Sequence, residues 1–548
     1  MGSSLSRRSS SYASSSARNT AMSQDSDDYT AVLAYLLRSG QIRLLSPHSA
    51  DFLDDSDEDD FIECCPESDP FPDTTKIDAS DLKQELLTNA GATHNASLSM
   101  GATVPQMLHK RQIGSYHRRG FSPNDRCEVG AVFLPNYHRT LCQHPAKVFC
   151  GTFSMDGSIF LSACQDQNLR IYDVRNNRFK KFKEIRARDV GWSVLDTAFS
   201  PDGQYLIYSS WSQSVHICNI YGDYDTHTAL NLQPYIEGHF CAFSIRFSND
   251  NKEILAGAND GCIYIYDREK NERVMRIESH EDDVSAVCFA DRSSQILFSG
   301  ADDGLCKVWD RRMLSDSNAK PVGVLAGHMD GITFIDSKGD GRHLITNSKD
   351  QSIKLWDMRK FSPDHVIEAS RRVVAQQHWD YRWQQAPKRS KRKRFIKGET
   401  SLMTYRGHGV LHTLLRCRFS PQFSTGQRYI YAACATGAVV IYDVLTGEVI
   451  RKLGGHRQCV RDVSWHPYEN RIISSGWDGC HVMHSYRRER DPDDEDNSDD
   501  DNPYLESSSD DEDDEEGGDI FRSIRTVGRR RQRCRRTERR SHSPIGFF

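Results

Sequence analysis

Histidine, serine and aspartate recur together along this chain of 548 residues, and these side chains can build the triad of a nucleophilic hydrolase. His280, Ser299 and Asp303 form one such set. Similar sets return twice further along the chain: His328, Thr346, Asp350 and His456, Ser474, Asp478. Catalysis needs a single copy, whereas a repeated set belongs to repeated structure. The sequence also lacks Gly-x-Ser-x-Gly, His-Glu-x-x-His and phosphate-loop motifs, so we predict that the protein is not an enzyme.

Two Trp-Asp-x-Arg boxes place a guanidinium group two residues after a carboxylate. Trp309 and Asp310 precede Arg312, and one repeat later Trp356 and Asp357 precede Arg359. An Arg just past the end of a strand should emerge at the rim of one face of the fold. A solvated Arg is the alternative interpretation, since exposed arginines are common. Because Arg is favoured at interfaces, we predict that Arg312 and Arg359, with Asp310 and Asp357 beside them, form a docking patch.

Other repeats carry the pattern unevenly. Arg175 and Arg487 occupy the matching position in the first and last repeats. Arg268 is followed by Glu269, so the third repeat departs from the pattern. The string Trp379-Asp380-Tyr381-Arg382 also matches the box, but it breaks the period and lies in an insertion at 360–400. We expect that insertion to emerge on the same face as Arg312 and Arg359.

Composition excludes several classes of protein. The 16 cysteines include no Cys-x-x-Cys pair and no Cys/His cluster at zinc spacing, so the sequence predicts no metal, no cofactor and a reducing compartment. No apolar run approaches the roughly 20 residues that span a bilayer. The net charge of -6 hides acidic and basic segments at the ends of the chain.

The elements that must position these residues come from an internal repeat. Units end in an apolar-apolar-Asp string or a worn copy of it, and the endings are 46, 48, 43, 47, 86 and 42 residues apart. The endings are Ile171-Tyr172-Asp173, Ile217-Cys218-Asn219, Ile265-Tyr266-Asp267, Val308-Trp309-Asp310, Leu355-Trp356-Asp357, Ile441-Tyr442-Asp443 and Met483-His484-Ser485. The long step contains the insertion. The other steps are near the roughly 40–45 residues of a four-stranded propeller blade.

Two further markers keep step with the endings. A His precedes five of them, and a turn Asp stands before the last strand-like run of five. The histidines are His239, His280, His328, His408 and His456, and the aspartates are Asp166, Asp260, Asp303, Asp350 and Asp478. These units resemble WD repeats. Seven units can bury their sheet faces only in a ring, so we predict an all-β, seven-bladed WD40 propeller over 125–487.

The WD resemblance implies a hydrogen-bonded set of His, Ser or Thr, Asp and Trp in each complete unit. In the fourth unit the set is His280, Ser299, Asp303 and Trp309. In the fifth unit the set is His328, Thr346, Asp350 and Trp356. The seventh unit has His484 where the Trp would stand, so we expect it to be less well fastened.

The paired boxes also resemble those of WD-repeat substrate receptors of cullin-4 RING ubiquitin ligases. Several strings that are not general WD consensus resemble one receptor of this class: 187–194, 210–212, 216–222, 279–284 and 380–385. The resemblance implies a receptor that binds the damaged-DNA-binding protein 1 adaptor through Arg312 and Arg359. Through the adaptor it would join cullin-4 and the RING subunit and present an unidentified protein for ubiquitination. A WD-repeat scaffold in a chromatin or RNA-processing assembly is the alternative.

The remaining segments are predicted to be tails and extensions. Residues 1–28 are Ser-rich, and 488–548 are acidic and then basic, so both should be disordered. The extension at 29–124 should contain an amphipathic helix at 29–45, a candidate for adaptor docking or for packing on the propeller, and a second helix over Asp78–Asn89.

Two short motifs bear on location. The basic run Lys388, Arg389, Lys391, Arg392, Lys393, Arg394 indicates nuclear import, and the expected location is the nucleus and cytoplasm. It lacks the interleaved aromatic residues that stack on bases, which argues against nucleic-acid binding. Gly2 fits a permissive myristoylation pattern, but one acyl chain gives only reversible membrane contact.

Overall fold

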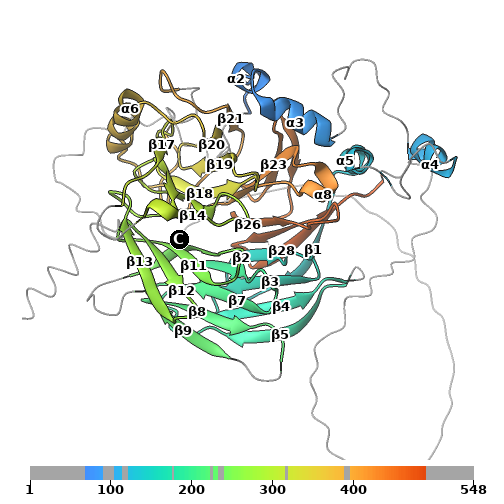
Figure 1. Ribbon diagram of the computed structural model, residues 1–548. Helices are drawn as coiled ribbons and strands as arrows, with labels where there is room; N and C mark the ends of the chain where they lie inside the picture. The colour runs from blue at the N-terminus through green and yellow to red at the C-terminus, as the bar shows by residue number, and fades with distance from the viewer. Residues whose placement is uncertain are drawn as a thin grey trace, which may run out of the picture. The chain divides into compact units, whose positions relative to one another are not determined.

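The computed structural model describes residues 68–90, 104–113, 121, 123–175, 178–222, 226–232, 240–314, 319–387 and 395–488. Seven four-stranded antiparallel sheets follow one another around a ring, which confirms the predicted seven-bladed propeller (Figure 1). Within these ranges no helix is long and apolar enough to cross a membrane. The expected helix at 29–45 and the marker His239 lie outside the described residues.

Each of the first six blades is built from four consecutive strands. The strands of blades 1 to 3 are β2 (Val148–Phe153), β3 (Ile159–Cys164), β4 (Asn168–Asp173), β5 (Lys180–Arg186), β6 (Asp196–Phe199), β7 (Tyr205–Ser209), β8 (Ser214–Asn219), β9 (His227–Asn231), β10 (Ala242–Phe247), β11 (Glu253–Ala258), β12 (Cys262–Asp267) and β13 (Glu272–Glu278). The strands of blades 4 to 6 are β14 (Ala286–Phe289), β15 (Ile296–Gly300), β16 (Cys306–Asp310), β17 (Gly323–Leu325), β18 (Ile332–Ser337), β19 (His343–Ser348), β20 (Ser352–Asp357), β21 (Met403–Arg406), β22 (Cys417–Phe419), β23 (Tyr429–Ala433), β24 (Val439–Asp443) and β25 (Val449–Leu453).

The seventh blade closes the ring with strands from both ends of the folded region. It contains β26 (Val460–Trp465), β27 (Ile472–Gly476) and β28 (Cys480–Ser485), and its outermost strand is β1 (Tyr137–Gln143). β1 pairs antiparallel with β28, and a β-bulge interrupts the register between Thr140 and Cys142. Because ring closure leaves only short strand edges exposed, this pairing completes the fold.

Burial follows strand position within each blade. Second and third strands are nearly continuous apolar runs because both of their faces meet neighbouring blades. Every residue of β3 and β11 is buried, for example, whereas the outermost strand β5 is largely exposed. The apolar clusters between adjacent blades therefore form a continuous core around the ring.

Antiparallel order defines two faces of the ring. Connections from first to second and from third to fourth strands lie at one face, which we name the box face because Asp310 and Asp357 end third strands there. Connections from second to third strands and between blades lie at the other, which we name the opposite face. The residues after both Trp-Asp pairs therefore share one face.

Helices N-terminal to the ring pack on blades 5 and 6. The short helices α2 (Thr75–Asp78) and α3 (Asp81–Ala90) lie beside these blades (Figure 1). Their side chains Ile77, Leu82 and Leu86 share one apolar cluster with Tyr405 and Tyr442. The helix expected over Asp78–Asn89 thus exists and begins three residues later. The other described helices outside the insertion are α4 (Val104–Gln112), α5 (Pro123–Val132), the 3-10 turn η2 (Arg311–Met313) and α8 (Gln422–Thr425).

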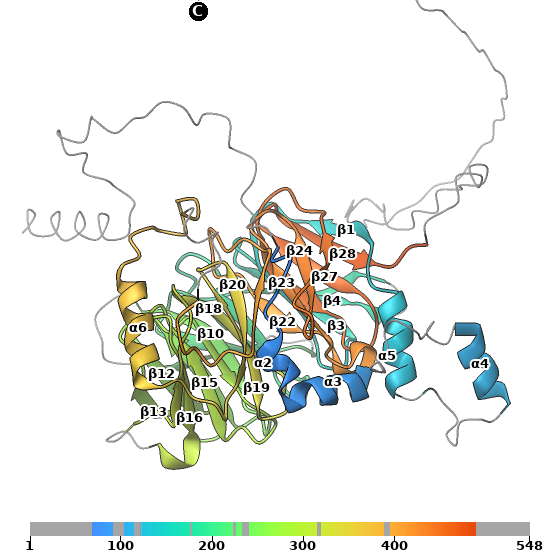
Figure 2. The same cartoon turned by 90° about the horizontal axis from the view of Figure 1, so that it is seen from above.

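The insertion at 360–400 emerges at the box face, as expected, but it does not stay on that face. It leaves the end of β20 and forms α6 (Asp364–Ala375) beside the ring (Figure 2). Val366 is buried, and the Ser370 hydroxyl donates to the carbonyl of His328 at 2.7 Å. The indole of Trp379 then donates to Asp330, in the connection between blades 4 and 5, at 2.9 Å. The third box string therefore lies at the opposite face.

A buried histidine between blades 5 and 6 leads to a pH prediction. The Nε2–H of His408 donates to the Asn347 side-chain oxygen at 2.9 Å, and its Nδ1 accepts from the Tyr442 hydroxyl at 2.9 Å. Burial lowers the pKa of His408 to about 4. Between pH 6.5 and pH 4 the unfolded chain binds a proton that the folded chain refuses, so stability falls as pH falls. This residue should cost about 3 kcal/mol across that window, measured by urea unfolding.

The control for this prediction is the same substitution at an exposed histidine. His365 is exposed on α6, so His365→Gln should change the free energy of unfolding at pH 7 by no more than about 0.5 kcal/mol. His408→Gln should be less stable at pH 7 but should show a shallower slope. An unchanged slope in His408→Gln would contradict the assignment.

Candidate protein-docking face

The repeated His, Ser or Thr, Asp and Trp sets of blades 4 and 5 are internal braces. In blade 4 the Ser299 hydroxyl lies 2.8 Å from His280 Nε2 and accepts from the Trp309 indole at 2.9 Å, while His280 Nδ1 lies 2.8 Å from Asp303. Burial lowers the pKa of His280, so the ring is neutral. Ser299 has no exposed surface. A hydroxyl that no substrate can reach is not a nucleophile, which agrees with a structural role.

Blade 5 repeats this geometry. His328 lies 2.9 Å from Asp350 and 2.6 Å from Thr346, and the Trp356 indole donates to Thr346 at 2.8 Å. Burial raises the pKa of Asp350, but the contact with His328 outweighs this effect and holds the pKa far below its usual range. The set links the connection before β18, which carries His328, to strands β19 and β20 of the same blade. It therefore fixes the position of β20, which ends at Asp357.

In the seventh blade a histidine stands where the sets of blades 4 and 5 have a tryptophan. His484 takes the place of the Trp, and its Nε2 lies 2.8 Å from the Ser474 hydroxyl. His456 bridges Ser474 and Asp478 at 2.8 and 2.9 Å. A His ring nitrogen can replace the indole nitrogen as a partner of the serine, so the hydrogen-bonded set is complete.

Arg312 is exposed and held in a fixed orientation. Its Nε donates to Asp310 Oδ1 at 2.9 Å and its Nη2 to Oδ2 at 2.6 Å, while its backbone N–H donates to the same carboxylate at 3.0 Å. The side chain is 68% exposed. A guanidinium group has five N–H donors, so this fork leaves the remaining donors facing solvent. The arrangement suits a partner's carboxylate or carbonyl groups.

Arg311, which precedes Arg312, makes a contact within the propeller instead of facing solvent. Arg311 turns toward the neighbouring blade and pairs with Glu253 of β11. Its side chain is largely covered, and its backbone N–H donates to Gln295 at 2.8 Å. Of the two adjacent arginines, one braces blades 3 and 4 and only Arg312 is presented outward.

Exposed apolar side chains share the box face with Arg312, in the connections that follow β16 and β20. Met313 is 74% exposed, Val322 49% and Phe361 37%. The Phe361 ring packs directly over Gly323, where even a Cβ atom would collide with it. An Arg among exposed apolar side chains is typical of the centre of a protein interface. We name Arg312, Met313, Val322 and Phe361 the Arg312 patch.

Arg359 is not equivalent to Arg312. Its fork to Asp357 is longer, at 3.3 and 3.4 Å, because Arg342 binds the same carboxylate at 3.1 Å. Helix α3 also reaches this box: Asp81 lies 3.5 Å from Arg359 and 3.1 Å from Arg342. The second box therefore already contacts an acidic helix of the same chain, and the first does not among the described residues.

The other matching arginines divide between the two faces. Arg175 forks to Asp173 on the box face and is 66% exposed. Arg382 forks to Asp380 in the same way, at 2.9 and 2.7 Å, but lies at the opposite face. The Arg487 guanidinium stacks on Tyr137, 5.0 Å from the ring centre.

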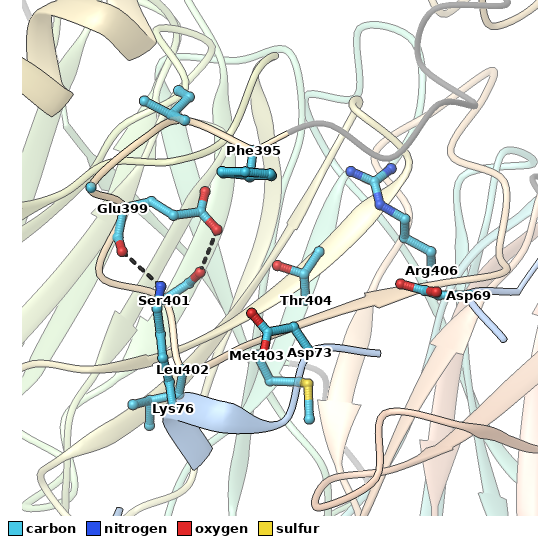
Figure 3. Close-up of a pocket in the computed structure, with 12 residues that line it drawn as sticks. Asp69, Asp73, Lys76, Phe395, Glu399, Ser401, Leu402, Met403, Thr404 and Arg406 are labelled. Carbon is cyan, nitrogen blue, oxygen red and sulfur yellow. Dashed lines mark hydrogen bonds between the residues drawn. The ribbon is translucent and has the colours of Figure 1, made fainter. Parts of the chain in front are cut away.

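A pocket of about 470 Å³ lies at the outer edge of blade 5 (Figure 3). One wall comes from the segment before α3, which contributes Asp69, Asp73 and Lys76, and the other from the end of the insertion and β21. Lys76 donates to the carbonyl of Glu399 at 2.8 Å and joins the walls. Three acidic and two basic side chains line it, and this mixture of both signs gives the pocket no strong preference for a charged ligand.

One functional set was missed in the sequence. Ser162, Asp166 and Tyr172 of blade 1 have the spacing of Ser299, Asp303 and Trp309, with His144 in the place of the His. Its contacts differ from those of blades 4 and 5, because Asp166 pairs with Arg170 and the Tyr172 hydroxyl lies near His144. Extending the markers to Tyr in the place of Trp would have found it.

Several predicted residues lie outside the described part of the chain. They are Gly2 and the basic run Lys388, Arg389, Lys391, Arg392, Lys393, Arg394. The same holds for the predicted tail at 1–28 and, apart from Arg488, for the predicted tail at 488–548.

Comparisons with known proteins agree with the fold. The family model described as WD domain, G-beta repeat matches residues 136–173, 231–267, 271–310, 319–357 and 447–482. The ring and its braces thus define a WD-repeat propeller protein.

Sequence comparison with individual relatives identifies the family within this class. The chain is 41% identical over 412 residues to a DDB1- and CUL4-associated factor 11 homolog of Caenorhabditis elegans, covering 73% of this chain and 70% of that protein. It is 42% identical over 396 residues to the LEC14B protein of Lithospermum erythrorhizon, covering 70% and 82%. The chain belongs to the WD-repeat family of these proteins. The pre-mRNA-splicing factor cwf17 of Schizosaccharomyces pombe is 23% identical over 296 residues, 52% of this chain and 82% of that protein.

Proposed function

We propose that this protein is a substrate-recognition subunit of a cullin-4 RING ubiquitin ligase, which binds the damaged-DNA-binding protein 1 adaptor through its box face. The observation that carries the proposal is the Arg312 patch. A preorganised guanidinium with free donors shares the box face with exposed apolar side chains. The name of the Caenorhabditis elegans relative, which associates that protein with DDB1 and CUL4, supports the choice of partner.

Preorganisation explains why an Asp precedes the Arg. Ordering a long side chain at an interface costs about 0.5–1.5 kcal/mol. The fork with Asp310 restricts the guanidinium before any partner arrives, so binding needs less ordering. The backbone N–H of Arg312 is held by the same carboxylate. Asp310 thus acts as a positioning residue for Arg312.

The receptor's mechanism is positional. The box face binds the adaptor, and another surface holds the target protein. The ligase then transfers ubiquitin to a target whose effective concentration is raised by tethering. No residue of this chain takes part in the covalent chemistry.

Charge reversal at Arg312 tests the adaptor site. We expect Arg312→Asp to lower recovery of the adaptor in affinity capture by at least about tenfold, since it places two carboxylates together where a partner expects a cation. The tagged full chain and the variant should be expressed at matched levels, and adaptor and cullin-4 should be quantified by mass spectrometry.

Arg382→Asp is the matched control. Arg382 has the same fork to a neighbouring Asp and is 46% exposed, but it lies at the opposite face. Its reversal should leave adaptor recovery unchanged. If wild type and Arg312→Asp recover the same partners with no cullin adaptor, the ligase role fails and the scaffold in a chromatin or RNA-processing assembly becomes the better explanation.

Arg359→Asp should have a smaller effect than Arg312→Asp, because Asp81 of α3 and Arg342 already share its site. The location proposed for the receptor is the nucleus and cytoplasm, from the basic run at 388–394. Exclusion of a tagged chain from the nucleus would refute that part alone.

A further inference from the structure

The seam where the ring closes brings together sulfur and nitrogen ligands from both ends of the folded region. Cys142 of β1, His144 just after it and His481 of β28 each offer one atom, and these atoms lie within 4.8 Å of one another. We name these three residues the seam cluster. We propose that the seam cluster binds a zinc-class transition metal ion that clasps the first strand to the last blade.

The distances suit a tetrahedral metal. Zinc–sulfur bonds of about 2.3 Å and zinc–nitrogen bonds of about 2.0–2.1 Å place the two ligand atoms about 3.6 Å apart. The Sγ of Cys142 and the Nε2 of His144 are 3.6 Å apart. His481 completes the set after a modest approach, since its ligand atom is already within 4.8 Å of both others.

Local backbone structure aims these side chains together. Cys142 faces His481 directly in the pairing of β1 with β28, and the β-bulge just before it resets which face each β1 residue occupies. The backbone N–H of His144 donates to the carbonyl of Gly479 at 2.7 Å, which anchors the chain after β1 to the turn before β28. The cluster is thus built by the closure itself.

A fourth position is available. The Tyr172 hydroxyl lies 3.4 Å from His144 Nε2 and 4.0 Å from Cys142 Sγ. Cys142 and His144 are only half-buried, whereas His481 is fully buried. Either the phenol oxygen or a water molecule can complete the coordination, and an ion can enter from the half-buried side.

Hydrogen bonds already orient the buried imidazole of the seam cluster. His481 has serine hydroxyls at both nitrogens: Ser475 at 2.9 Å from Nδ1 and Ser162 at 2.7 Å from Nε2. A metal ion bound at Nε2 would replace Ser162, which has a second partner in Cys164 at 3.6 Å. Ser475 would remain and orient the ring, as outer partners of histidine ligands commonly do.

The donor set selects the metal. One thiolate and two imidazoles favour zinc-class ions over calcium or magnesium, which prefer oxygen. Binding forms one metal–sulfur and two metal–nitrogen bonds, breaks the Cys142 S–H bond and releases that proton to solvent, with no change of oxidation state. A second group, Glu85, Asp340 and His343, is a poorer candidate because the Lys338 ammonium already lies 3.0 Å from Asp340.

Cobalt and zinc provide the test. The full chain, purified with a phosphine reductant and stripped of metal, should bind one equivalent of Co²⁺ and develop a near-ultraviolet thiolate-to-cobalt absorption band. Zn²⁺ should displace the cobalt and raise the melting temperature by a few degrees. Cys142→Ser should abolish the band and weaken cobalt binding by more than about a hundredfold, beyond the loss caused by an outer partner.

The matched control is Cys288→Ser, which removes a half-buried cysteine from β14, outside the seam. It should retain the band and the zinc effect, and His144→Ala should lose the zinc effect. Circular dichroism and urea unfolding without metal show whether each variant folds. Absence of the band in the folded wild type, or its persistence in Cys142→Ser, would overturn the proposal and leave a network of hydrogen bonds.

Discussion

Trp356→Ala is expected to lower the free energy of unfolding by about 3–5 kcal/mol. The indole is fully buried in the core between blades 4 and 5, with Phe298 and Leu344 in the same cluster. Its removal opens a cavity that the rigid blades cannot collapse to fill. It also removes the donor to Thr346, which holds His328. Equilibrium urea unfolding followed by tryptophan fluorescence and circular dichroism gives the difference.

Two comparison variants separate volume from hydrogen bonding. Trp356→Phe keeps much of the apolar contact and loses the indole N–H, so it should cost less than the alanine variant. Trp383→Ala removes an indole that is 68% exposed and should change stability by no more than about 0.5 kcal/mol. Equal losses for Trp356→Ala and Trp383→Ala would show that the brace contributes nothing.

Arg416→Met should have a comparable effect through charge. The Arg416 guanidinium, 3% exposed, lies 2.7 Å from Asp196 and 2.8 Å from Asp462 and so joins blades 2, 6 and 7 across the inside of the ring. Burial raises the pKa of Asp196, but Arg416 and Arg246 outweigh it and hold the pKa at about 2. Removing one member of a buried ion pair typically costs about 3–5 kcal/mol, because the other charge remains in the interior.

The sign of the pH dependence distinguishes this mechanism from lost packing. A carboxyl group whose folded pKa is depressed stabilises the protein above its unfolded pKa, and that contribution is lost as pH falls toward about 2. In Arg416→Met the pKa of Asp196 should rise, so the deficit in unfolding free energy should be largest at neutral pH and should narrow in acid.

A double variant adds a second check. Asp196→Asn in the Arg416→Met background should recover part of the loss, because it removes a buried charge that has lost one of its two cationic partners and keeps only Arg246 at 2.7 Å. A deficit that is constant with pH, and additive losses in the double variant, would indicate that Arg416 acts through its volume alone.

The position of α3 affects how the two boxes are used. Asp81 and Glu85 face Arg342, Arg359 and Lys338 on the box face of blade 5. The N-terminal extension therefore occupies part of the face that the proposed adaptor would approach. An adaptor that docks on the Arg312 patch meets this helix as part of the surface, or it must displace the contacts at 3.1 and 3.5 Å.

Much of the architecture could be predicted from the sequence, because a repeat shows the same residue pattern several times. The spacing of the unit endings, the in-phase His and Asp and the Trp-Asp strings predicted seven blades, and the structure has seven. The helix over Asp78–Asn89 was also readable, since Leu82 and Leu86 lie one turn apart on one face and both are buried.

Only the tertiary structure decided features that depend on contacts between distant segments. A local pattern cannot show that Arg311 braces Glu253 while Arg312 points outward, or that α3 reaches Arg359. A local pattern also cannot show that the insertion runs from the box face to the opposite face, since the packing of Val366 and the hydrogen bond of Trp379 determine the path of that segment. The closure of a ring places Cys142 beside His481, and no spacing along the chain encodes that neighbour. A sequence repeat predicts the structure of residues at its repeated positions. The contacts of residues outside the repeat depend on how distant segments pack in three dimensions, so the sequence alone does not predict them.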